Sequence, residues 1–246
     1  MSTERLDIEL VIRGFTDSRA KAQAFIKEKR VSVNGVIAKK ASQKISDDAN
    51  VEVENRGREW VGRGAFKLLA ALEHFKYDPA GKIAADIGAS TGGFSEVLLS
   101  QDIAKVYAVD VGHGQLHSSL LDEPKLINLE GLNAKSLERE HIPEPLDLIV
   151  SDVSFISLKK ALPAVLSLCK PGACLFTLVK PQFEVGKQNI GKGGIVKDPM
   201  LIEAVRVDIE EWICSQAGWQ SLGIIDSPIT GADGNREFLL GAKYNA

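Results

Sequence analysis

Hydrophobic positions in the first fifty residues have helical spacing in two runs and then the alternation of short strands. The second helical run opens with the candidate caps Asp17 and Ser18. Asn34-Gly35 separates two β-rich runs and tolerates the positive φ angles of a tight hairpin turn. The pattern predicts two helices and a small sheet, a compact α+β domain over residues 1–55. The runs are residues 6–14 (LDIELVIRG), 17–30 (DSRAKAQAFIKEKR), 31–39 (VSVNGVIAK) and 50–54 (NVEVE).

A glycine-rich, charged stretch follows, and we expect residues 56–63 to form a linker. Trp60 and Val61 within it are interpreted as an anchor on the domain that comes next. Residues 64–75 (GAFKLLAALEHF) have helical apolar spacing, and Lys67 lies off their apolar stripe, where an exposed lysine would be ordinary.

From residue 83 the chain alternates short apolar runs with helical ones, which is typical of a doubly wound, largely parallel α/β sheet. The last two apolar runs have no helix between them. The last strand should therefore be antiparallel, as in methyltransferases that use S-adenosylmethionine (SAM). The expected strands are IAADIG, AKVYAVDVG, KLINLEG, LDLIVSD, ACLFTLVKP, WQSLGIIDSPI and NREFLLGAK, and the expected helices are GGFSEVLLSQ, QLHSSLLDE, SLKKALPAVLSLC and DPMLIEAVRVDIEEWICSQAG.

Composition places the chain among ordinary globular proteins with a reduced, cytoplasmic setting. Of its 246 residues 44% are hydrophobic and 26% charged, and the three cysteines lack C-x-x-C spacing. No run is apolar enough for a signal sequence or a membrane span. The net charge of −3 hides an asymmetry: basic residues outnumber acidic ones 12 to 10 in residues 1–62 and are outnumbered 18 to 23 afterwards.

The basic excess at the N-terminus is predicted to neutralise phosphates on structured RNA. Solvated helix faces are the alternative reading of the same charges. The candidate RNA-binding residues are Arg19, Lys21, Lys27, Lys29, Arg30, Lys39 and Lys40.

The most distinctive stretch is DIGASTGGFSE, residues 86–96, in which seven residues are Gly, Ala, Ser or Thr. A turn this bare after the first strand of a sheet lets backbone N–H groups approach a ligand. About twenty residues on, Asp110 ends the next strand, where a carboxylate can accept hydrogen bonds from ribose hydroxyls. Because Ser90 stands where a pyrophosphate-binding G-x-G-x-x-G would have glycine, a phosphate-free adenosine ligand fits best.

Two other readings of this stretch are an incidental loop and the G-x-S-x-G elbow of a serine hydrolase, formed by Gly88, Ser90 and Gly92. The elbow needs strands laid down before it and a late histidine. Here the stretch follows the first strand, and the histidines at 113, 117 and 141 all precede the last three strands. His113 and His117 also lack a cysteine or acidic partner at metal-binding spacing, so no metal is expected.

Three charged residues are expected at the same edge of the sheet. Asp152 and Lys180 end parallel strands, and Glu237 opens the antiparallel last strand, whose beginning lies beside the other strands' ends. Capping and simple charge neutralisation would explain them separately, whereas their convergence beside a ligand favours a functional site.

Two resemblances add to this picture. SRAKAQAFIKEKRVSVNG resembles a small RNA-binding domain first described in a ribosomal small-subunit protein. DIGASTGGFSEVLL, DVGHGQL, SDVSFISL, LVKPQFEVGK and GNREF resemble, in order, the TlyA family, historically labelled hemolysin A and related to FtsJ-like ribose methyltransferases. The resemblance implies SAM-dependent 2′-O-methylation of cytidine in ribosomal RNA, by a Rossmann-like methyltransferase domain over residues 64–246.

The resemblance also implies roles for individual residues. The family's Lys-Asp-Lys-Glu tetrad maps onto Lys67, Asp152, Lys180 and Glu237, with Lys180 the candidate general base. Its Arg-x-Trp-Val linker motif maps onto residues 58–61, where Glu59 stands at a position often held by Ala. The expected cofactor contacts are Gly88, Ser90, Gly92, Asp110 and Asn133.

The expected partner is ribosomal RNA or a ribosomal subunit, without a membrane. The short termini favour large-subunit rRNA over both subunits, and the sequence predicts no oligomeric state. Two alternatives stay open: a membrane-active hemolysin, which would need an amphipathic or spanning segment, and a non-catalytic RNA-binding or ribosome-assembly protein.

Overall fold

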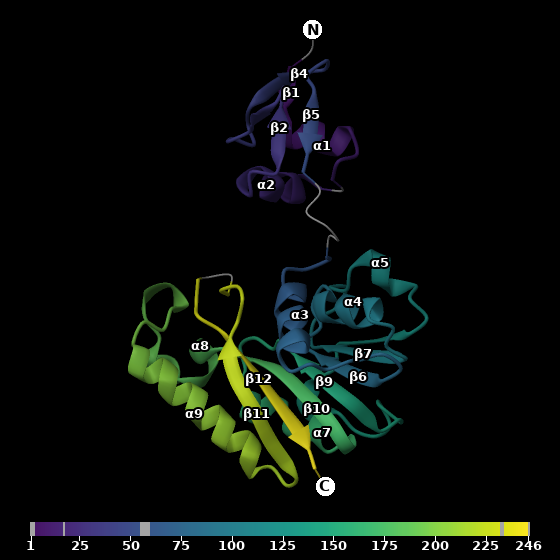
Figure 1. The fold of residues 1–246 in the computed structure, drawn as a ribbon, viewed down its shortest axis with the longest axis vertical. Helices are drawn as coiled ribbons and strands as arrows, with labels where there is room; N and C mark the ends of the chain where they lie inside the picture. The colour runs from purple at the N-terminus through teal and green to yellow at the C-terminus, as the bar shows by residue number, and fades with distance from the viewer. Residues whose placement is uncertain (1–2, 17, 55–59, 232–233, 246) are drawn as a thin grey trace. The chain divides into compact units, whose positions relative to one another are not determined.

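The computed structural model describes residues 3–16, 18–54, 60–231 and 234–245, and the chain divides into two compact units, Met1–Glu59 and Trp60–Ala246 (Figure 1). Some of the expectations fall outside the described residues: the candidate cap Asp17, the linker-motif residues Arg58 and Glu59, and residues 56–59 of the expected linker.

The N-terminal unit contains both expected helices, α1 (Leu6–Ile12) and α2 (Arg19–Lys27), and Ser18 caps α2 by accepting a hydrogen bond from the Lys21 N–H. Asn34 and Gly35 both have positive φ and turn the hairpin as predicted. Leu6, Leu10 and Phe25 fill the core between helices and strands. The strands are β2 (Val31–Val33), β3 (Val36–Ile37) and β5 (Val51–Val53), in the order β3-β2-β5, and the unpredicted pair β1 (Thr3–Arg5) and β4 (Lys44–Ser46).

The second unit is built on a seven-stranded sheet in the order β11-β12-β10-β9-β6-β7-β8. All neighbours from β10 to β8 are parallel, and β12 runs antiparallel to both β10 and β11, which confirms the predicted last strand. The strands are β6 (Ile83–Ile87), β7 (Lys105–Asp110), β8 (Leu126–Glu130), β9 (Leu146–Ser151), β10 (Cys169–Val179), β11 (Trp219–Asp226) and β12 (Phe238–Tyr244).

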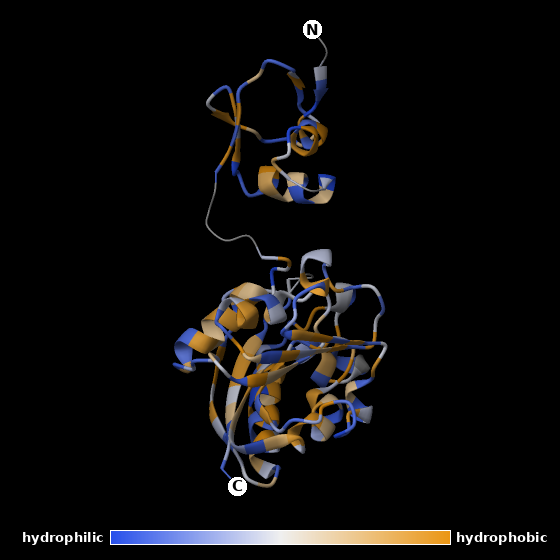
Figure 2. Ribbon diagram, turned by 90° about the vertical axis from the view of Figure 1, so that its right-hand side faces the viewer, coloured by the Kyte–Doolittle hydropathy of each residue, from blue (hydrophilic) through white to orange (hydrophobic). Residues whose placement is uncertain are grey.

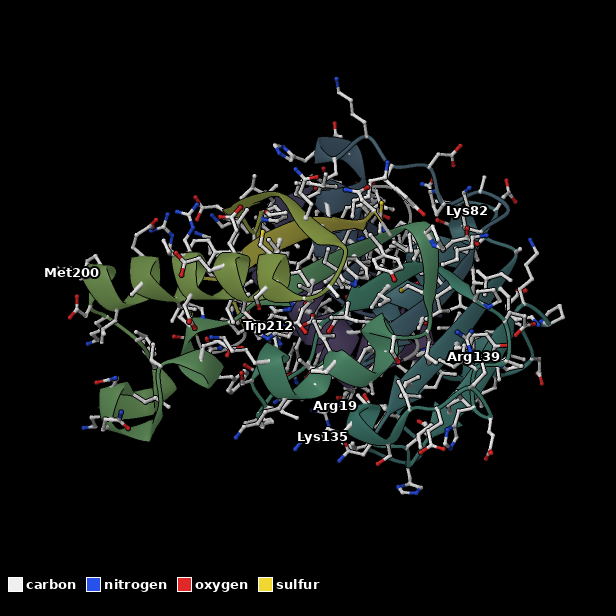
Figure 3. All side chains as sticks on the ribbon, turned by 90° about the horizontal axis from the view of Figure 1, so that it is seen from below. Arg19, Lys82, Lys135, Arg139, Met200 and Trp212 are labelled. Atoms are coloured by element: carbon white, nitrogen blue, oxygen red, sulfur yellow. The ribbon has the colours of Figure 1, made fainter. Side chains whose placement is uncertain are left out.

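Helices cover both faces of this sheet, and the hydrophobic residues concentrate between the layers (Figure 2). On one face lie α3 (Ala65–His74), α4 (Gly93–Ser100) and α5 (Ser118–Leu121). The other face carries α6 (Leu158–Ala161), α7 (Pro163–Leu166) and α9 (Pro199–Ser215). Figure 3 shows α9 running from the exposed Met200 to Trp212, which packs against the core.

Two expected helices are shorter than predicted. The run at residues 157–169 breaks into α6 and α7, because Pro163 lacks the N–H that would continue the helical hydrogen bonds. The run at residues 115–123 forms only α5. Three further short helices follow β10: α8 (Pro181–Glu184), η2 (Lys187–Asn189) and η3 (Lys192–Gly194). The segments that follow β6, β7, β9 and β10 all leave the sheet at its carboxyl edge, where β12 begins.

Candidate active site

A cavity of 1190 Å³ opens at the carboxyl edge of the sheet, and a smaller one of 360 Å³ adjoins it. The two share Gly88, Ser90 and Asp152 as lining residues. The larger is also lined by Lys67, Lys180 and Glu237, whereas Asp110 and Asn133 line the smaller. The predicted site residues of this unit therefore meet around one continuous hollow, with Gly92 as the exception.

The small-residue turn packs closely against the segment that follows β9. Gly88 has a φ of +84°, and a Cβ there would lie 3.0 Å from the carbonyl oxygen of Asp152. The Ser90 N–H donates to Asp110 Oδ2 over 2.8 Å, and the Gly112 N–H donates to Oδ1 of the same carboxylate over 2.8 Å. Asp110 thus ties the turn to the end of β7. Each of its oxygens can accept a further hydrogen bond, so it is still able to bind a hydroxyl.

Gly92 serves the turn in a different way from the one expected. It lies in the left-handed region with a φ of +91°, but in the described structure it lines neither cavity. A side chain there would collide with Leu116 and Leu120 of the α5 region. The geometry therefore explains Gly92 by packing of the turn against α5, and the sequence pattern alone could not separate this from close approach of a ligand.

Asp86, inside β6, is a cavity residue that the sequence analysis did not select. Its side chain is fully buried, and Oδ2 accepts hydrogen bonds from both the N–H and the hydroxyl of Ser95. Oδ1 has no hydrogen-bond partner among the described residues. Burial raises the pKa of Asp86 to about 7. The sequence did contain a sign of its importance, since Asp86 is the charged residue of an otherwise apolar strand, and a buried charge needs a partner.

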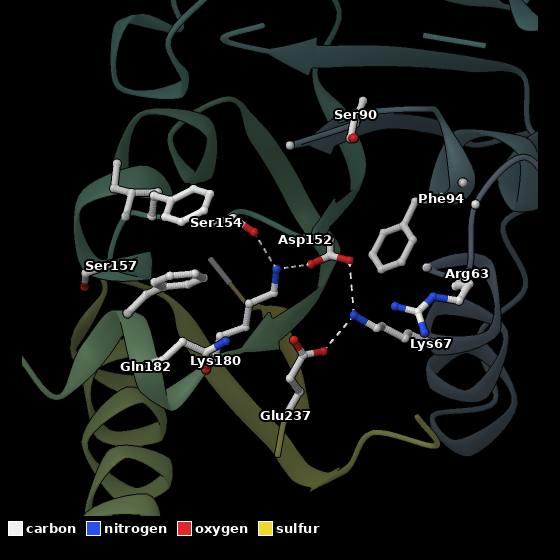
Figure 4. Close-up of a pocket in the computed structure, with 18 of the residues that line it drawn as sticks. Arg63, Lys67, Ser90, Phe94, Asp152, Ser154, Ser157, Lys180, Gln182 and Glu237 are labelled. Carbon is white, nitrogen blue, oxygen red and sulfur yellow. Dashed lines mark hydrogen bonds and ion pairs between the residues drawn. The ribbon is translucent and has the colours of Figure 1, made fainter. Parts of the chain in front are cut away.

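Four charged side chains form a connected cluster at the larger cavity (Figure 4). Lys67 Nζ donates to Glu237 Oε2 over 2.7 Å and lies 3.5 Å from Asp152 Oδ2. Lys180 Nζ forms an ion pair with Asp152 Oδ1 at 2.6 Å. The cluster has no net charge when all four groups are ionised. Lys67 lies in α3, Asp152 and Lys180 directly follow β9 and β10, and Glu237 directly precedes β12.

Three of the four charged side chains in the cluster are buried. Lys67, Lys180 and Glu237 are each no more than 8% exposed. Removing charged groups from water costs several kcal/mol per ion unless partners compensate, so such a set is weak evidence for stability and a better indication of function. Lys67, expected from its helix position to be exposed, is buried because Glu237 and Asp152 supply its partners.

The hollow also fits an adenosine-type cofactor, the group expected from the sequence. Gly88 has no side chain to cover the backbone of the turn, and no described group donates a hydrogen bond to the buried Oδ1 of Asp86. Asp110 and Asn133 line the smaller cavity. The described residues hold no group of three or more His, Cys, Asp or Glu side chains placed to bind a metal. A serine hydrolase would need a histidine bonded to the Ser90 hydroxyl, and that hydroxyl makes no described hydrogen bond. The ring of His117 contacts the Ser119 hydroxyl, and His141 Nδ1 accepts from the Glu138 N–H.

In the N-terminal unit, most of the candidate RNA-binding residues are exposed: Arg19, Lys27, Lys29, Lys39 and Lys40. Lys21 is only partly exposed. Arg19 is oriented by Asp7, a fully buried carboxylate that also binds Arg5 and Gln23.

Arg30 departs from the expectation that it faces phosphates. Its side chain is 10% exposed, its guanidinium lies 3.8 Å from the centre of the Phe25 ring, and its Nε donates to the Glu54 carbonyl. A cation used in this way stabilises the unit's core. Sequence could not reveal this, because an arginine beside a turn looks the same whether it turns inward or outward.

Comparison with known proteins places this geometry in a family. Residues 60–244 match the FtsJ-like methyltransferase family, and residues 4–51 match the S4 domain. The 16S/23S rRNA (cytidine-2′-O)-methyltransferase TlyA of Mycobacterium tuberculosis is 45% identical over 237 residues, which cover 96% of this chain and 88% of the relative. The chain belongs to the TlyA family.

Other TlyA relatives carry different names. Hemolysin A of Brachyspira hyodysenteriae is 39% identical over 96% of this chain and 98% of its own length. The 23S rRNA (cytidine-2′-O)-methyltransferase TlyA of Campylobacter jejuni is 40% identical over 73% of this chain and 69% of its own. The solved structure of a hemolysin-like protein from Streptococcus thermophilus has a TM-score of 0.76 and 34% identity, covering all of this chain and 90% of that one.

The TlyA family thus joins methyltransferase and hemolysin names on one fold. None of the helices in the described residues combines the length and the apolar character needed to cross a bilayer.

Proposed function

We propose that this TlyA-family protein transfers a methyl group from SAM to the ribose 2′-hydroxyl of cytidine in ribosomal RNA. The observation that carries the proposal is the buried cluster of two lysines and two carboxylates beside the small-residue turn. Two TlyA relatives, from Mycobacterium tuberculosis and Campylobacter jejuni, bear the name of this activity.

The cluster supplies what a ribose hydroxyl needs. A 2′-hydroxyl is a poor nucleophile until its proton is removed, so the enzyme must align it with the methyl donor and offer a base. Lys180 lines the cavity and is assigned to take that proton as a neutral amine. Asp152 orients Lys180 and stabilises the ammonium that forms. Lys67, held by Glu237, is assigned to position the ribose oxygen.

The cofactor is assigned to the hollow between the turn and β7. SAM, when bound, supplies an electrophilic sulfonium methyl. Gly88 would allow its close approach to the backbone, Ser90, Asp110 and Asn133 would contact its nucleoside part, and Asp86 Oδ1 would accept from its ammonium group. Gly92 is assigned to keeping the turn in shape.

The N-terminal unit is assigned to RNA binding through its exposed basic residues. Ribosomal subunits in the cytoplasm are the proposed partners, with the large subunit first among them. This assignment rests on the S4 match and on the charge of exposed residues in and after α2 and after the hairpin.

Purified small and large ribosomal subunits provide the direct test. Each is incubated with the protein and labelled SAM, and its rRNA is digested to nucleosides. We expect label in 2′-O-methylcytidine and none without subunits. Absence of label from both subunits would overturn the proposal. RNA binding without transfer would favour the assembly-protein alternative, and leakage of dye from lipid vesicles would favour the membrane-active one.

Asp86 makes a separate prediction about the pH dependence of SAM binding. The pKa of Asp86, about 7, lies above the usual value for aspartate. Lowering the pH below 7 therefore protonates the carboxylate and removes the negative charge that is assigned to bind the ammonium group of SAM. SAM affinity measured by calorimetry should fall about tenfold or more from pH 7.5 to 5.5. Asp86→Asn should bind SAM weakly at both pH values and lose this dependence. A wild-type affinity that is flat across the range would contradict the assignment.

A further inference from the structure

We propose that Ser154 is a positioning residue that fixes the direction of the Lys180 amine, an inference that rests on the function proposed above. Ser154 lies two residues beyond Asp152, in the segment that leaves β9. Lys180 Nζ donates to its Oγ over 2.9 Å (Figure 4).

The two lysines of the cluster have different surroundings. Lys67 is held by two carboxylates, from Glu237 and Asp152, whereas Lys180 meets one carboxylate, Asp152, and the hydroxyl of Ser154. An ammonium group has three N–H bonds in tetrahedral directions. The Ser154 hydroxyl takes one of them, and Asp152 lies beside the amine as its ion-pair partner, which leaves a direction for a group in the cavity.

This arrangement suits a base that changes its charge. As a neutral amine, Lys180 keeps an N–H bond toward Ser154, and its lone pair takes the direction that faces the cavity. After the ribose proton is transferred, that proton occupies the same direction. The Ser154 hydroxyl accepts a hydrogen bond in both states, so it holds the orientation and takes no proton itself.

The segment carrying Ser154 is tied to the segment carrying Lys180 at two other places. The rings of Phe155 and Phe183 lie 5.2 Å apart, and the Leu158 N–H donates to Glu184 Oε1 over 2.9 Å. These contacts do not involve the serine hydroxyl. Removing that hydroxyl is therefore expected to release the Lys180 amine while the two segments stay together.

The kinetic test compares Ser154→Ala with Ser154→Thr, which restores a hydroxyl. In single-turnover methylation, Ser154→Ala should be slower by about tenfold, the equivalent of one hydrogen bond of roughly 1.4 kcal/mol. KM for SAM and for the ribosomal subunit should stay within about twofold, since the contact serves the reacting amine. Ser154→Thr should recover most of the rate. Ser167→Ala, which removes an exposed hydroxyl bonded to a carbonyl of α7, is the matched control.

A second readout does not depend on methyl transfer. Nitrogen-15 NMR of the lysine side chains, with Lys180→Met to assign the signal, should show several-fold faster exchange of the Nζ protons of Lys180 in Ser154→Ala. If the wild type transfers no methyl group, the proposed function fails while this measurement still tests the contact. Unchanged exchange, a rate within twofold of wild type, or a raised KM at an unchanged rate would each overturn the inference. Ser154→Cys replaces the alanine variant if thermal melting shows that the latter does not fold.

Discussion

Lys180→Met is expected to lose methyl transfer by about 10²- to 10⁴-fold while its affinity for SAM and rRNA stays within a few-fold of wild type. Methionine fills a similar volume but has no amine. A base acts on the proton only as the transition state forms, so its loss should appear in the chemical step and hardly in ground-state binding. Single-turnover methylation together with calorimetry for SAM separates the two effects.

Lys125→Met is the matched control, because Lys125 is exposed and precedes β8 away from the cluster. Asp152→Ala should be as severe as Lys180→Met, and Lys67→Ala and Glu237→Ala should each lower the rate. A Lys180→Met rate within about threefold of wild type would mean that Lys180 is a structural counter-charge.

Gly88→Val should weaken SAM binding by at least about 100-fold, or ~2.7 kcal/mol. A β-branched residue is strained at a φ of +84°, and its Cβ would be pressed against the backbone of Asp152 and Val153. Relief of that contact must move either the turn or the segment that carries Asp152. Calorimetric titration with SAM measures the loss, and the melting temperature shows whether the fold is kept.

Two variants isolate the cause. Gly172→Val places the same residue at a φ of +87° in open space, so it should bind SAM normally. Ser90→Ala should also bind, because the described contact of Ser90 is its backbone N–H to Asp110. Inactivation by Ser90→Ala, joined to esterase activity in the wild type, would instead revive the hydrolase-elbow reading.

Sequence reasoning predicted the strands and their directions well, because hydrophobic runs mark the strands and the missing helix before the last strand indicates that it is antiparallel. The order of the strands in the sheet was not predicted. It also placed Asp152, Lys180 and Glu237 at one edge, since each stands at the end or beginning of a strand. Lys67 entered only by family resemblance. Its helical position indicates exposure, and the partner that buries it lies 170 residues away in the sequence.

The remaining misses have a common physical origin in side-chain direction. Periodicity shows which face of an element is apolar, but it does not show where a polar side chain ends. Asp86 was read only as part of a strand, although its side chain binds Ser95 at the cavity. The Arg30 side chain packs on Phe25, and Gly92 lies against Leu116 and Leu120 near α5 and does not line the hollow. Each outcome depends on contacts between segments that only the folded chain brings together.

The placement of β12 has a consequence for how the protein is made. β12 follows every other strand of this sheet in the chain, yet it is inserted between β10 and β11, and it brings Glu237 to Lys67, a residue of the unit's first helix. On the ribosome, the hollow of a growing chain therefore stays incomplete until Phe238–Tyr244 have emerged. Chains that end before this strand would leave β10 with an open edge and Lys67 without Glu237, and we expect such fragments to aggregate.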